Sequence, residues 1–327
     1  MVAFNLMERL VCPVHRSRLA HQAETLRCDS GCEYPVFHGV PFLLPDEIKH
    51  TSNAMANESY EYVRKLKARA GDESVSVVNG HIDDRVQEFV AHTNSLLYKS
   101  VIGKLDRYPI PEIPMRSSAP GEVLLDIGCG WGRWCLAAAQ QGFIPVGIDP
   151  SLPHLLAAQR VAKQLNLEAY FVVADSRYLP FLPNTFDAAF SFSVLQHFSH
   201  KNVELTIESL APLMKAGGTS KLHILNWIGL RSLQVQLSRG FRDGPDEFDT
   251  RYWSIRDALR VFGARLGPSR VEVDGYFVQA RYEDRDLLTA TNRTMLEISH
   301  ALTAAARTVP LLGKFADNVF IVSQSAK

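Results

Sequence analysis

The sequence lacks a long apolar run. One apolar stretch, residues 186–198, is interrupted by Asp187, Gln196 and His197, whereas a membrane-crossing helix needs about 18 consecutive apolar residues. Residues 1–20 also lack the apolar core and the small-residue cleavage site of a secretion signal. We therefore predict a soluble, cytoplasmic protein without a membrane span.

The chain also lacks an excess of either charge. Its 327 residues include 35 Lys and Arg against 35 Asp and Glu, which gives a formal net charge of zero. Dedicated nucleic-acid binders usually carry a basic excess, so this balance disfavours a nucleic-acid partner. The length predicts about two domains, with enough residues for a substantial core.

Cysteine is scarce and unevenly placed. Of the five cysteines, Cys12, Cys28 and Cys32 lie near the N-terminus, and Cys129 and Cys135 follow about a hundred residues later. An odd number with a cluster of three fits metal binding in a reducing compartment better than a disulfide framework.

Three regions differ in composition. Residues 1–45 are rich in Cys, His and Pro, whereas residues 46–120 have helical periodicity and end in a Pro-rich linker. From 121 to 327, predicted strands and helices alternate, which is typical of an α/β sheet. We expect a Rossmann-like, mostly parallel sheet of seven strands with an antiparallel final strand, preceded by a small metal-binding domain and a helical segment. The predicted strands are residues 122–127, 144–149, 169–174, 186–191, 220–225, 271–278 and 318–322, and the predicted helices are residues 133–141, 152–165, 203–214, 254–262 and 284–308.

A glycine-rich turn is the strongest motif. Residues 126–132 (DIGCGWG) follow a predicted strand and precede a helix. Glycine permits positive φ and lets a ligand approach the backbone, and the start of the helix adds free N–H groups. Dinucleotide sites use the spacing G-x-G-x-x-G, whereas the spacing here is G-x-G-x-G. Asp149 ends the next strand, where a carboxylate can accept both hydroxyls of a ribose, and Asp175 ends the third, where it can accept from an adenine amino group.

With these segments in this order, the chain resembles the class I S-adenosylmethionine-dependent methyltransferases, in particular the methyltransferase type 11 group, over residues 121–225. The alternative is a plain Rossmann-like domain whose glycines only make turns, and an NAD-dependent oxidoreductase is disfavoured by the glycine spacing. The resemblance implies S-adenosylmethionine as cofactor. It implies these cofactor-binding residues: Asp126, Gly128, Cys129, Gly130, Gly132, Asp149, Pro150, Asp175, Ser176, Ser193 and Gln196.

The N-terminal cysteines have the spacing of a zinc site. Cys12 and His15 form C-x2-H, and Cys28 and Cys32 form C-x3-C after twelve intervening residues. Two such knuckles supply the four tetrahedral nitrogen and sulfur ligands of structural zinc. His21 and His38 are alternative fourth ligands, although neither has knuckle spacing.

Residues 10–45 resemble the small zinc-ribbon proteins that partner and activate tRNA and protein methyltransferases. The matching stretches are LVCP at 10–13, EYPV at 33–36 and GVPFLLP at 39–45. Those relatives carry cysteine where His15 stands. The resemblance implies a zinc-ribbon domain over residues 1–45 that is a candidate docking surface for a protein partner.

The sequence also lacks several acceptor-specific motifs. The end of the fourth strand reads SFSV at 191–194 instead of the Pro-Pro-aromatic motif used for exocyclic amines or glutamine, and no cysteine follows Cys135 for cytosine C5 chemistry. Residues 193–199 contain no carboxylate that could serve metal-assisted O-methylation. These absences favour a small-molecule or glycan acceptor with an oxygen nucleophile. The alternatives are an RNA methyltransferase, because a zinc ribbon is fused to this fold in a ribosomal-RNA guanine methyltransferase family, and a non-catalytic cofactor-binding module.

His197 is the candidate general base. It follows the fourth strand, and histidine has an unperturbed pKa near ~6.5, so its neutral form can take a hydroxyl proton at cellular pH. In related type 11 enzymes a histidine here also packs against the cofactor or caps the next helix. The inserts 227–253 and 284–315 flank the expected substrate side. The first of them carries candidate binding residues for an anionic or sugar-like substrate, namely Arg231, Arg239, Arg242, Arg251, Tyr252 and Trp253.

Overall fold

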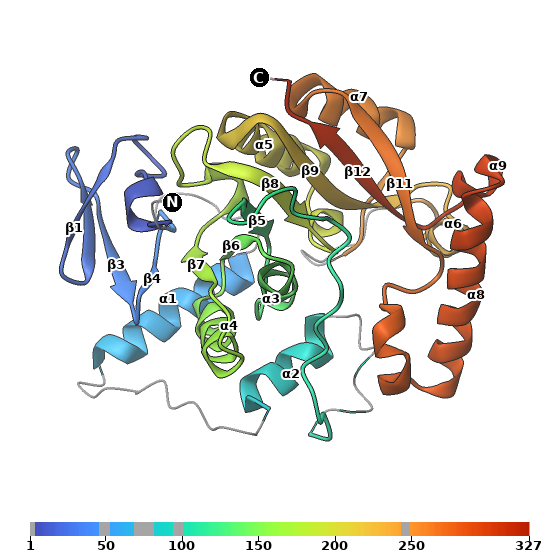
Figure 1. Cartoon of the computed structure of the whole chain (residues 1–327), viewed down its shortest axis with the longest axis horizontal. Coiled ribbons are helices and arrows are strands. Elements are labelled where there is room, and N and C mark those ends of the chain that lie inside the picture. Colours follow the sequence, from blue (N-terminus) through green and yellow to red (C-terminus); the bar gives the residue numbers. More distant parts are fainter. Residues whose placement is uncertain are drawn as a thin grey trace.

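The computed structural model describes residues 4–45, 53–68, 82–93, 98, 101, 103–242 and 249–326. Its centre is a sheet in the order β11-β12-β9-β8-β5-β6-β7, with the two-residue β10 also paired to β9 (Figure 1). Neighbouring strands from β9 to β7 are parallel, and β12 is antiparallel to both of its neighbours. All seven predicted strands lie in this sheet, so the mostly parallel topology with an antiparallel final strand is confirmed. The two-residue β10 is an eighth strand that the sequence analysis does not predict. The strands are β5 (Val123–Ile127), β6 (Ile144–Asp149), β7 (Tyr170–Val173), β8 (Phe186–Ser191), β9 (Met214–Asn226), β10 (Tyr252–Trp253), β11 (Ser269–Gly275) and β12 (Asn318–Gln324).

Helices cover both faces of this sheet (Figure 1). The helix α3 (Arg133–Gln140) and the helix α4 (Leu152–Gln164) pack on one face, and α5 (His200–Leu210) and α7 (Ile255–Leu266) pack on the other. Strand β5 is buried along its whole length, with Leu124 and Leu125 in separate apolar clusters on opposite faces. Such doubly covered parallel strands are apolar on both sides, which explains why their sequences are apolar runs without alternation.

The region before the sheet adds two helices to the α4 side. The helix α1 (Asn53–Ala68) and the helix α2 (Asp84–Thr93) both contact α4. They lie in the region that the sequence predicts to be helical, and the remaining predicted helical residues there fall largely outside the described part of the chain. Among the described residues, no helix combines the length and apolar character needed to cross a membrane.

The N-terminal residues form a small antiparallel sheet of four strands: β1 (Leu19–Gln22), β2 (Thr25–Cys28), β3 (Glu33–Phe37) and β4 (Val40–Pro41), preceded by the 3-10 turn η1 (Met7–Arg9). This sheet docks on the edge strand of the large one. The Leu43 amide donates to the Val173 carbonyl at 2.8 Å, and the Val11 amide donates to the Pro180 carbonyl at 2.9 Å. Docking covers backbone groups that an edge strand would otherwise expose, and Leu10, Leu26 and Leu43 enter the same apolar cluster as β5 and β8.

Among the element boundaries that differ from the sequence prediction, two helix boundaries have a clear local cause. The predicted helix 203–214 ends at Leu210, because the 3-10 turn η5 (Ala211–Leu213) contains Pro212 and Met214 already pairs with Phe186. The predicted helix 284–308 divides into the 3-10 helix η6 (Tyr282–Leu287) and α8 (Ala290–Ala306), because the Thr289 side chain caps α8 by accepting from the Asn292 amide. The remaining described elements are the 3-10 turns η3 (Ser176–Tyr178) and η4 (Leu195–His197), and the helices α6 (Leu230–Ser238) and α9 (Pro310–Gly313).

Candidate cofactor and metal sites

The glycine-rich turn joins β5 to α3. Gly128, Gly130 and Gly132 have φ values of +75°, +53° and +82°, which L residues with side chains rarely adopt. A Cβ at Gly128 would lie 2.5 Å from Val194 Cγ2, and one at Gly132 would lie 2.9 Å from Ala158 Cβ. By contrast, among the described residues no atom lies within 4 Å of a Cβ built at Gly130. The middle of the turn therefore leaves room for a ligand beside the backbone.

Asp149 connects this turn to the end of the second strand. Its Oδ2 accepts from the Gly130 amide at 3.0 Å, and its Oδ1 accepts from the Ser151 amide at 2.9 Å. A carboxylate has about four acceptor positions, so the buried Asp149 can still accept from a ligand. The sequence places Pro150 beside it, and the Pro150 carbonyl accepts from Ser59 Oγ of α1 at 2.7 Å.

Asp126 lies at the start of the turn and is buried. Its Oδ2 accepts from Cys135 Sγ at 3.3 Å, while its Oδ1 has no hydrogen-bond partner among the described residues. Burial raises the pKa of Asp126 to about 7, although the Cys135 thiol opposes the rise. Since a buried acceptor without a partner is costly, this oxygen fits a site that a ligand donor completes. Cys129, the neighbouring predicted residue, is buried with its thiol against Gly147.

Asp175 and Ser176, the predicted adenine contacts, are already engaged with protein. Asp175 Oδ2 accepts from Arg177 Nη2 at 2.8 Å, and its Oδ1 accepts from the Arg177 amide at 2.9 Å. Ser176 Oγ lies 3.0 Å from Thr206 Oγ1. These contacts fix the position of both residues at the end of β7, where a ligand would share their remaining acceptor positions.

A ring of hydrogen bonds lies at the end of β8. Ser193 Oγ donates to Gln279 Oε1 at 2.7 Å, Gln279 Nε2 donates to Gln196 Oε1 at 3.0 Å, and Gln196 Nε2 donates to Ser193 Oγ at 3.1 Å. Ser193 has φ of +60°, a backbone conformation that costs energy for a residue with a side chain. Val194, the next residue, packs against Gly128. The predicted residues Ser193 and Gln196 therefore lie beside the glycine turn.

His197 shares this edge of the sheet. Its Nε2 lies 3.3 Å from Gln196 Nε2, and its carbonyl accepts from Arg251 Nη1 at 2.8 Å. Gln279, which completes the ring, is missed by the sequence analysis because it follows β11, outside every motif. Of the other predicted substrate-side residues, Arg231 Nη1 donates to the Phe277 carbonyl and Arg239 pairs with Asp249.

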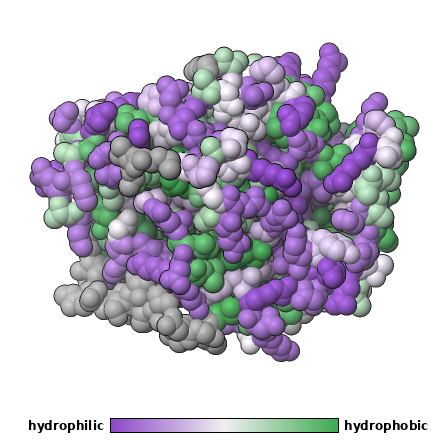
Figure 2. All heavy atoms as spheres, in the orientation of Figure 1, coloured by the Kyte–Doolittle hydropathy of each residue, from purple (hydrophilic) through white to green (hydrophobic). Residues whose placement is uncertain are grey.

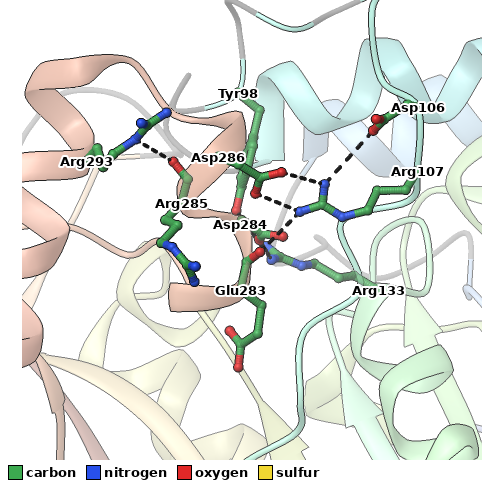
Figure 3. A network of polar contacts seen from close by, with 9 residues as sticks. All are labelled: Tyr98, Asp106, Arg107, Arg133, Glu283, Asp284, Arg285, Asp286 and Arg293. Carbon is green, nitrogen blue, oxygen red and sulfur yellow. Dashed lines mark hydrogen bonds and ion pairs between the residues drawn. The ribbon is translucent and has the colours of Figure 1, made fainter.

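A buried ion pair connects the turn to two distant segments (Figure 3). Arg133, directly after Gly132, donates from Nη2 to Asp284 Oδ2 at 2.5 Å, and the Tyr98 hydroxyl donates to the same oxygen at 2.5 Å. The Arg133 and Asp284 side chains are 5% and 2% exposed, and burial raises the pKa of Tyr98. Because breaking one partner of a buried pair costs about 3–5 kcal/mol, the pair holds η6 and the Tyr98 side chain against the first turn of α3.

The four predicted metal ligands are brought together. Their ligand atoms all lie within 4.8 Å of one another, and His15 Nδ1 is 3.6, 3.6 and 3.4 Å from the sulfurs of Cys12, Cys28 and Cys32. Tetrahedral zinc with Zn–S near ~2.3 Å and Zn–N near ~2.1 Å separates sulfur from nitrogen by about 3.6 Å. The donor set therefore fits zinc, and the alternatives His21 and His38 are not in the cluster.

Contacts around the cluster support it and tie it to the large sheet. Although burial raises the pKa of the Cys28 thiol, hydrogen bonds from the Cys32 and Ser30 backbone and from His15 bring it down to about 6, and a thiolate is the form that binds metal. The Tyr34 hydroxyl lies 3.3 Å from Cys12 Sγ. Arg16, next to His15, donates to the Leu179 and Phe181 carbonyls at 2.6 and 3.1 Å.

Comparison with known proteins gives the family of the central part of the chain. Residues 124–218 match the family described as "Methyltransferase domain". The chain contains a class I S-adenosylmethionine-dependent methyltransferase domain. A tRNA (carboxymethyluridine(34)-5-O)-methyltransferase of Schizosaccharomyces pombe is 27% identical over 176 residues, which are 52% of this chain and 66% of that protein. A Mycobacterium tuberculosis protein named as a probable fatty acid methyltransferase is 29% identical over 124 residues, 38% of this chain and 29% of that protein.

These matches cover less than two thirds of each relative's own length. Among solved structures, Haemonchus contortus phosphoethanolamine N-methyltransferase 2, in complex with phosphomonomethylethanolamine and S-adenosylhomocysteine, is 18% identical with a TM-score of 0.48. That match covers 76% of this chain and 61% of the other.

The raised pKa of Asp126 predicts a pH-dependent stability. Because the folded state holds the proton up to about pH 7 and the unfolded state loses it near ~3.9, the free energy of unfolding falls as pH rises between these values. Asp126→Asn removes this titration. Relative to that variant, the cofactor-free wild type should lose about 2–4 kcal/mol of stability between pH 4 and 7, since one pKa unit corresponds to about 1.4 kcal/mol.

Urea unfolding at several pH values measures this difference. Asp106→Asn is the control, because the Asp106 side chain is 85% exposed and its removal should leave the pH profile unchanged. A constant difference between wild type and Asp126→Asn from pH 4 to 8 would contradict the raised pKa.

Proposed function

We propose that the protein transfers the methyl group of S-adenosylmethionine to an oxygen of a small-molecule or glycan acceptor. One observation carries the cofactor assignment: a positive-φ glycine turn with free space at Gly130 lies between the Asp149 carboxylate and the unpartnered oxygen of Asp126. The amino group of the methionine part offers a donor to the unpartnered oxygen of Asp126, and the ribose hydroxyls offer donors to the acceptor positions that Asp149 still has. NAD has no ammonium group to offer Asp126.

Each residue around the turn has a role in this proposal. Asp126 would accept from the amino group of the methionine part, and Asp149 would accept from the ribose hydroxyls. Asp175 and Ser176 would flank the adenine, and Ser193 and Gln196 would line the sulfonium end. The backbone of Gly128, Cys129, Gly130 and Gly132, with Pro150, would line the rest of the cofactor. When bound, the cofactor supplies an electrophilic methyl group, and the protein positions the acceptor in line with it.

The acceptor proposal rests on the charge balance of the chain. The relatives named above are a methyltransferase of a tRNA uridine oxygen and one of fatty acids, so sequence similarity spans different acceptors. The zero net charge of this chain favours a small acceptor over RNA. If the protein were an RNA methyltransferase, it would bind RNA with an affinity that falls steeply as salt rises.

Calorimetry tests the cofactor assignment. Wild-type protein should bind S-adenosylmethionine in preference to NAD, and Asp149→Asn should bind it about ten- to a hundredfold more weakly, because a hydrogen bond to a charged group contributes about 1.5–3 kcal/mol. Asp106→Asn serves as the control. Since Asp149 also accepts from two backbone amides, the urea stability of the variant is measured alongside. Unchanged affinity in Asp149→Asn, or preference for NAD, would contradict the assignment.

We also propose one structural zinc ion on Cys12, His15, Cys28 and Cys32. Metal analysis should give about one zinc per chain, as in other four-ligand structural sites. Cys28→Ser should lose the metal and melt at a lower temperature, whereas Cys129→Ser, outside the cluster, should keep it. A wild-type protein without zinc, or full zinc content in Cys28→Ser, would exclude the site.

His197 is the proposed general base. A base that takes the acceptor's hydroxyl proton contributes about a hundredfold or more to the rate, so His197→Ala should reduce turnover by about that factor with cofactor affinity unchanged. The wild-type rate should also fall when the pH is lowered far enough to protonate the imidazole. The assay follows S-adenosylhomocysteine release over a panel of small hydroxylated acceptors and glycans, with His200→Ala as a nearby control. Wild-type turnover in His197→Ala across pH 6–9 would assign the residue a structural role.

A further inference from the structure

Exposed apolar side chains gather at one end of the molecule. Of the thirteen large apolar side chains that are exposed among the described residues, nine lie in residues 227–241 and 309–315. Leu237 and Leu311 are each 59% exposed. We call this region, formed by α6, its two flanks and the α9 region, the apolar end surface. It occupies the end where Figure 1 labels α6 and α9, and Figure 2 shows hydrophobic residues along that margin.

The helix α6 is inverted relative to an ordinary surface helix. It buries Ser232 and Gln236 and exposes Leu230, Leu233 and Leu237. Spacings of three and four residues place these leucines on one face, and that face points away from the core. Surface helices normally bury their apolar stripe, whereas α6 exposes its stripe to solvent.

Neighbouring aromatic residues extend the exposed face. The rings of Trp227 and Phe241, one at each end of α6, stack at 5.9 Å with an interplanar angle of 24°. The Leu230 amide donates to the Phe315 carbonyl at 3.1 Å, which places the α9 region against the start of α6. The apolar end surface is therefore continuous across the two segments.

Buried hydrogen bonds hold the inverted helix in place. Asp317, only 3% exposed, accepts from the Ser232 amide at 2.8 Å and from the Phe277 amide at 2.9 Å. Gln236 Nε2 donates to the Trp227 carbonyl at 2.7 Å. Rotating α6 to bury its leucines would break these contacts and leave buried polar groups without partners. The surface is thus built with its apolar side outward.

The charges around this surface indicate its partner. The segments 226–242 and 307–316 contain no acidic residue and five exposed basic residues: Arg231, Arg239, Arg242, Arg307 and Lys314. Arg239 pairs with Asp249 at 3.5 Å, so the other four form the basic rim of the surface. Asp243, Asp246 and Glu247 follow in the chain but lie outside the described residues. A second copy of the chain would bring two sets of cations face to face, which is unfavourable. Outward leucines with aromatic flanks and arginines at the rim are instead typical of segments that lie in a membrane interface.

We propose that the apolar end surface binds an anionic phospholipid bilayer. The leucines and aromatic rings of α6, its flanks and the α9 region enter the boundary between headgroups and acyl chains, roughly 5–10 Å deep. The four cations of the basic rim lie at the lipid phosphates. Lipid binding by this surface requires neither zinc nor methyl transfer, so the experiment on it is independent of the experiments on zinc and on the cofactor.

Vesicle co-sedimentation of the full chain tests the proposal. Wild-type protein should sediment with phosphatidylcholine vesicles that contain phosphatidylglycerol, and much less with pure phosphatidylcholine. The double variant Leu237→Glu/Leu311→Glu should bind at least about tenfold more weakly, because it places charges in the apolar boundary. Leu165→Glu, at an exposed leucine beyond the end of α4, is the matched control and should bind as wild type does. Both positions of the double variant are exposed, and a thermal melt checks that it folds.

Three results of the vesicle experiment would overturn the proposal: absence of binding to anionic vesicles, equal binding to both kinds of vesicle, and binding by the folded double variant at the wild-type level. A light-scattering result would also overturn it: a wild-type dimer that Leu237→Glu converts to a monomer would identify the surface as an interface between copies of the chain.

Discussion

The two hydrogen bonds that the Asp149 carboxylate accepts from Gly130 and Ser151 are the contacts on which the candidate cofactor site depends. The bond from Gly130 joins the turn after β5 to the turn after β6, and the bond from Ser151 fixes the carboxylate within its own turn. The two turns are therefore held side by side. The glycines adopt positive φ values in a turn that is held on two sides. The Asp149 carboxylate accepts from the Gly130 amide, and the Val194 side chain packs against Gly128. Asp126 is buried under the same turn, and its Oδ1 has no hydrogen-bond partner among the described residues.

The N-terminal sheet completes the large sheet at the edge nearest this surface. Leu43 pairs with Val173, and Arg16 donates to the carbonyls of Leu179 and Phe181, a few residues after Asp175. The knuckle that contains His15 is therefore fixed to the segment expected to flank adenine. Leu10, Leu26 and Leu43 share an apolar cluster with the central strands. One continuous core therefore joins the sheet that carries the candidate zinc ligands to the methyltransferase domain.

The sequence predicts most of the sheet and the part of the site that comes from adjacent strand ends, because both follow from the properties of buried parallel strands. Buried parallel strands are short apolar runs, so β6 and β8 have the bounds predicted for them. The ends of adjacent parallel strands meet at one edge, which brings Gly130 to Asp149 as the motif spacing implies. The start of β9 is missed because the glycine pair at 217–218 suggests a helix end, whereas the chain leaves the helix seven residues earlier.

Contacts between distant segments have no such local signal. The ring that joins Ser193 and Gln196 to Gln279 spans more than eighty residues, and the pair of Tyr98 and Asp284 spans 186. Glutamine, tyrosine and aspartate at those positions are compatible with any exposed surface, so only the folded arrangement assigns them a role. The same holds for α6, where the periodicity of its leucines would suggest a core-facing stripe, and the direction of that stripe is decided by Asp317, far along the chain.

Because of these long-range contacts, the surroundings of the glycine turn are polar, whereas the insert that follows β9 is apolar on its outer side. Around the glycine turn, the segments that follow β11 and precede β5 supply buried charges and amides, which fix polar groups at defined positions next to the candidate cofactor. Beyond β9, the insert turns its apolar side chains outward instead. The widely shared strand–turn motif thus accounts for the cofactor end. The proposed lipid-binding surface lies in the inserts, whose residues no shared motif constrains.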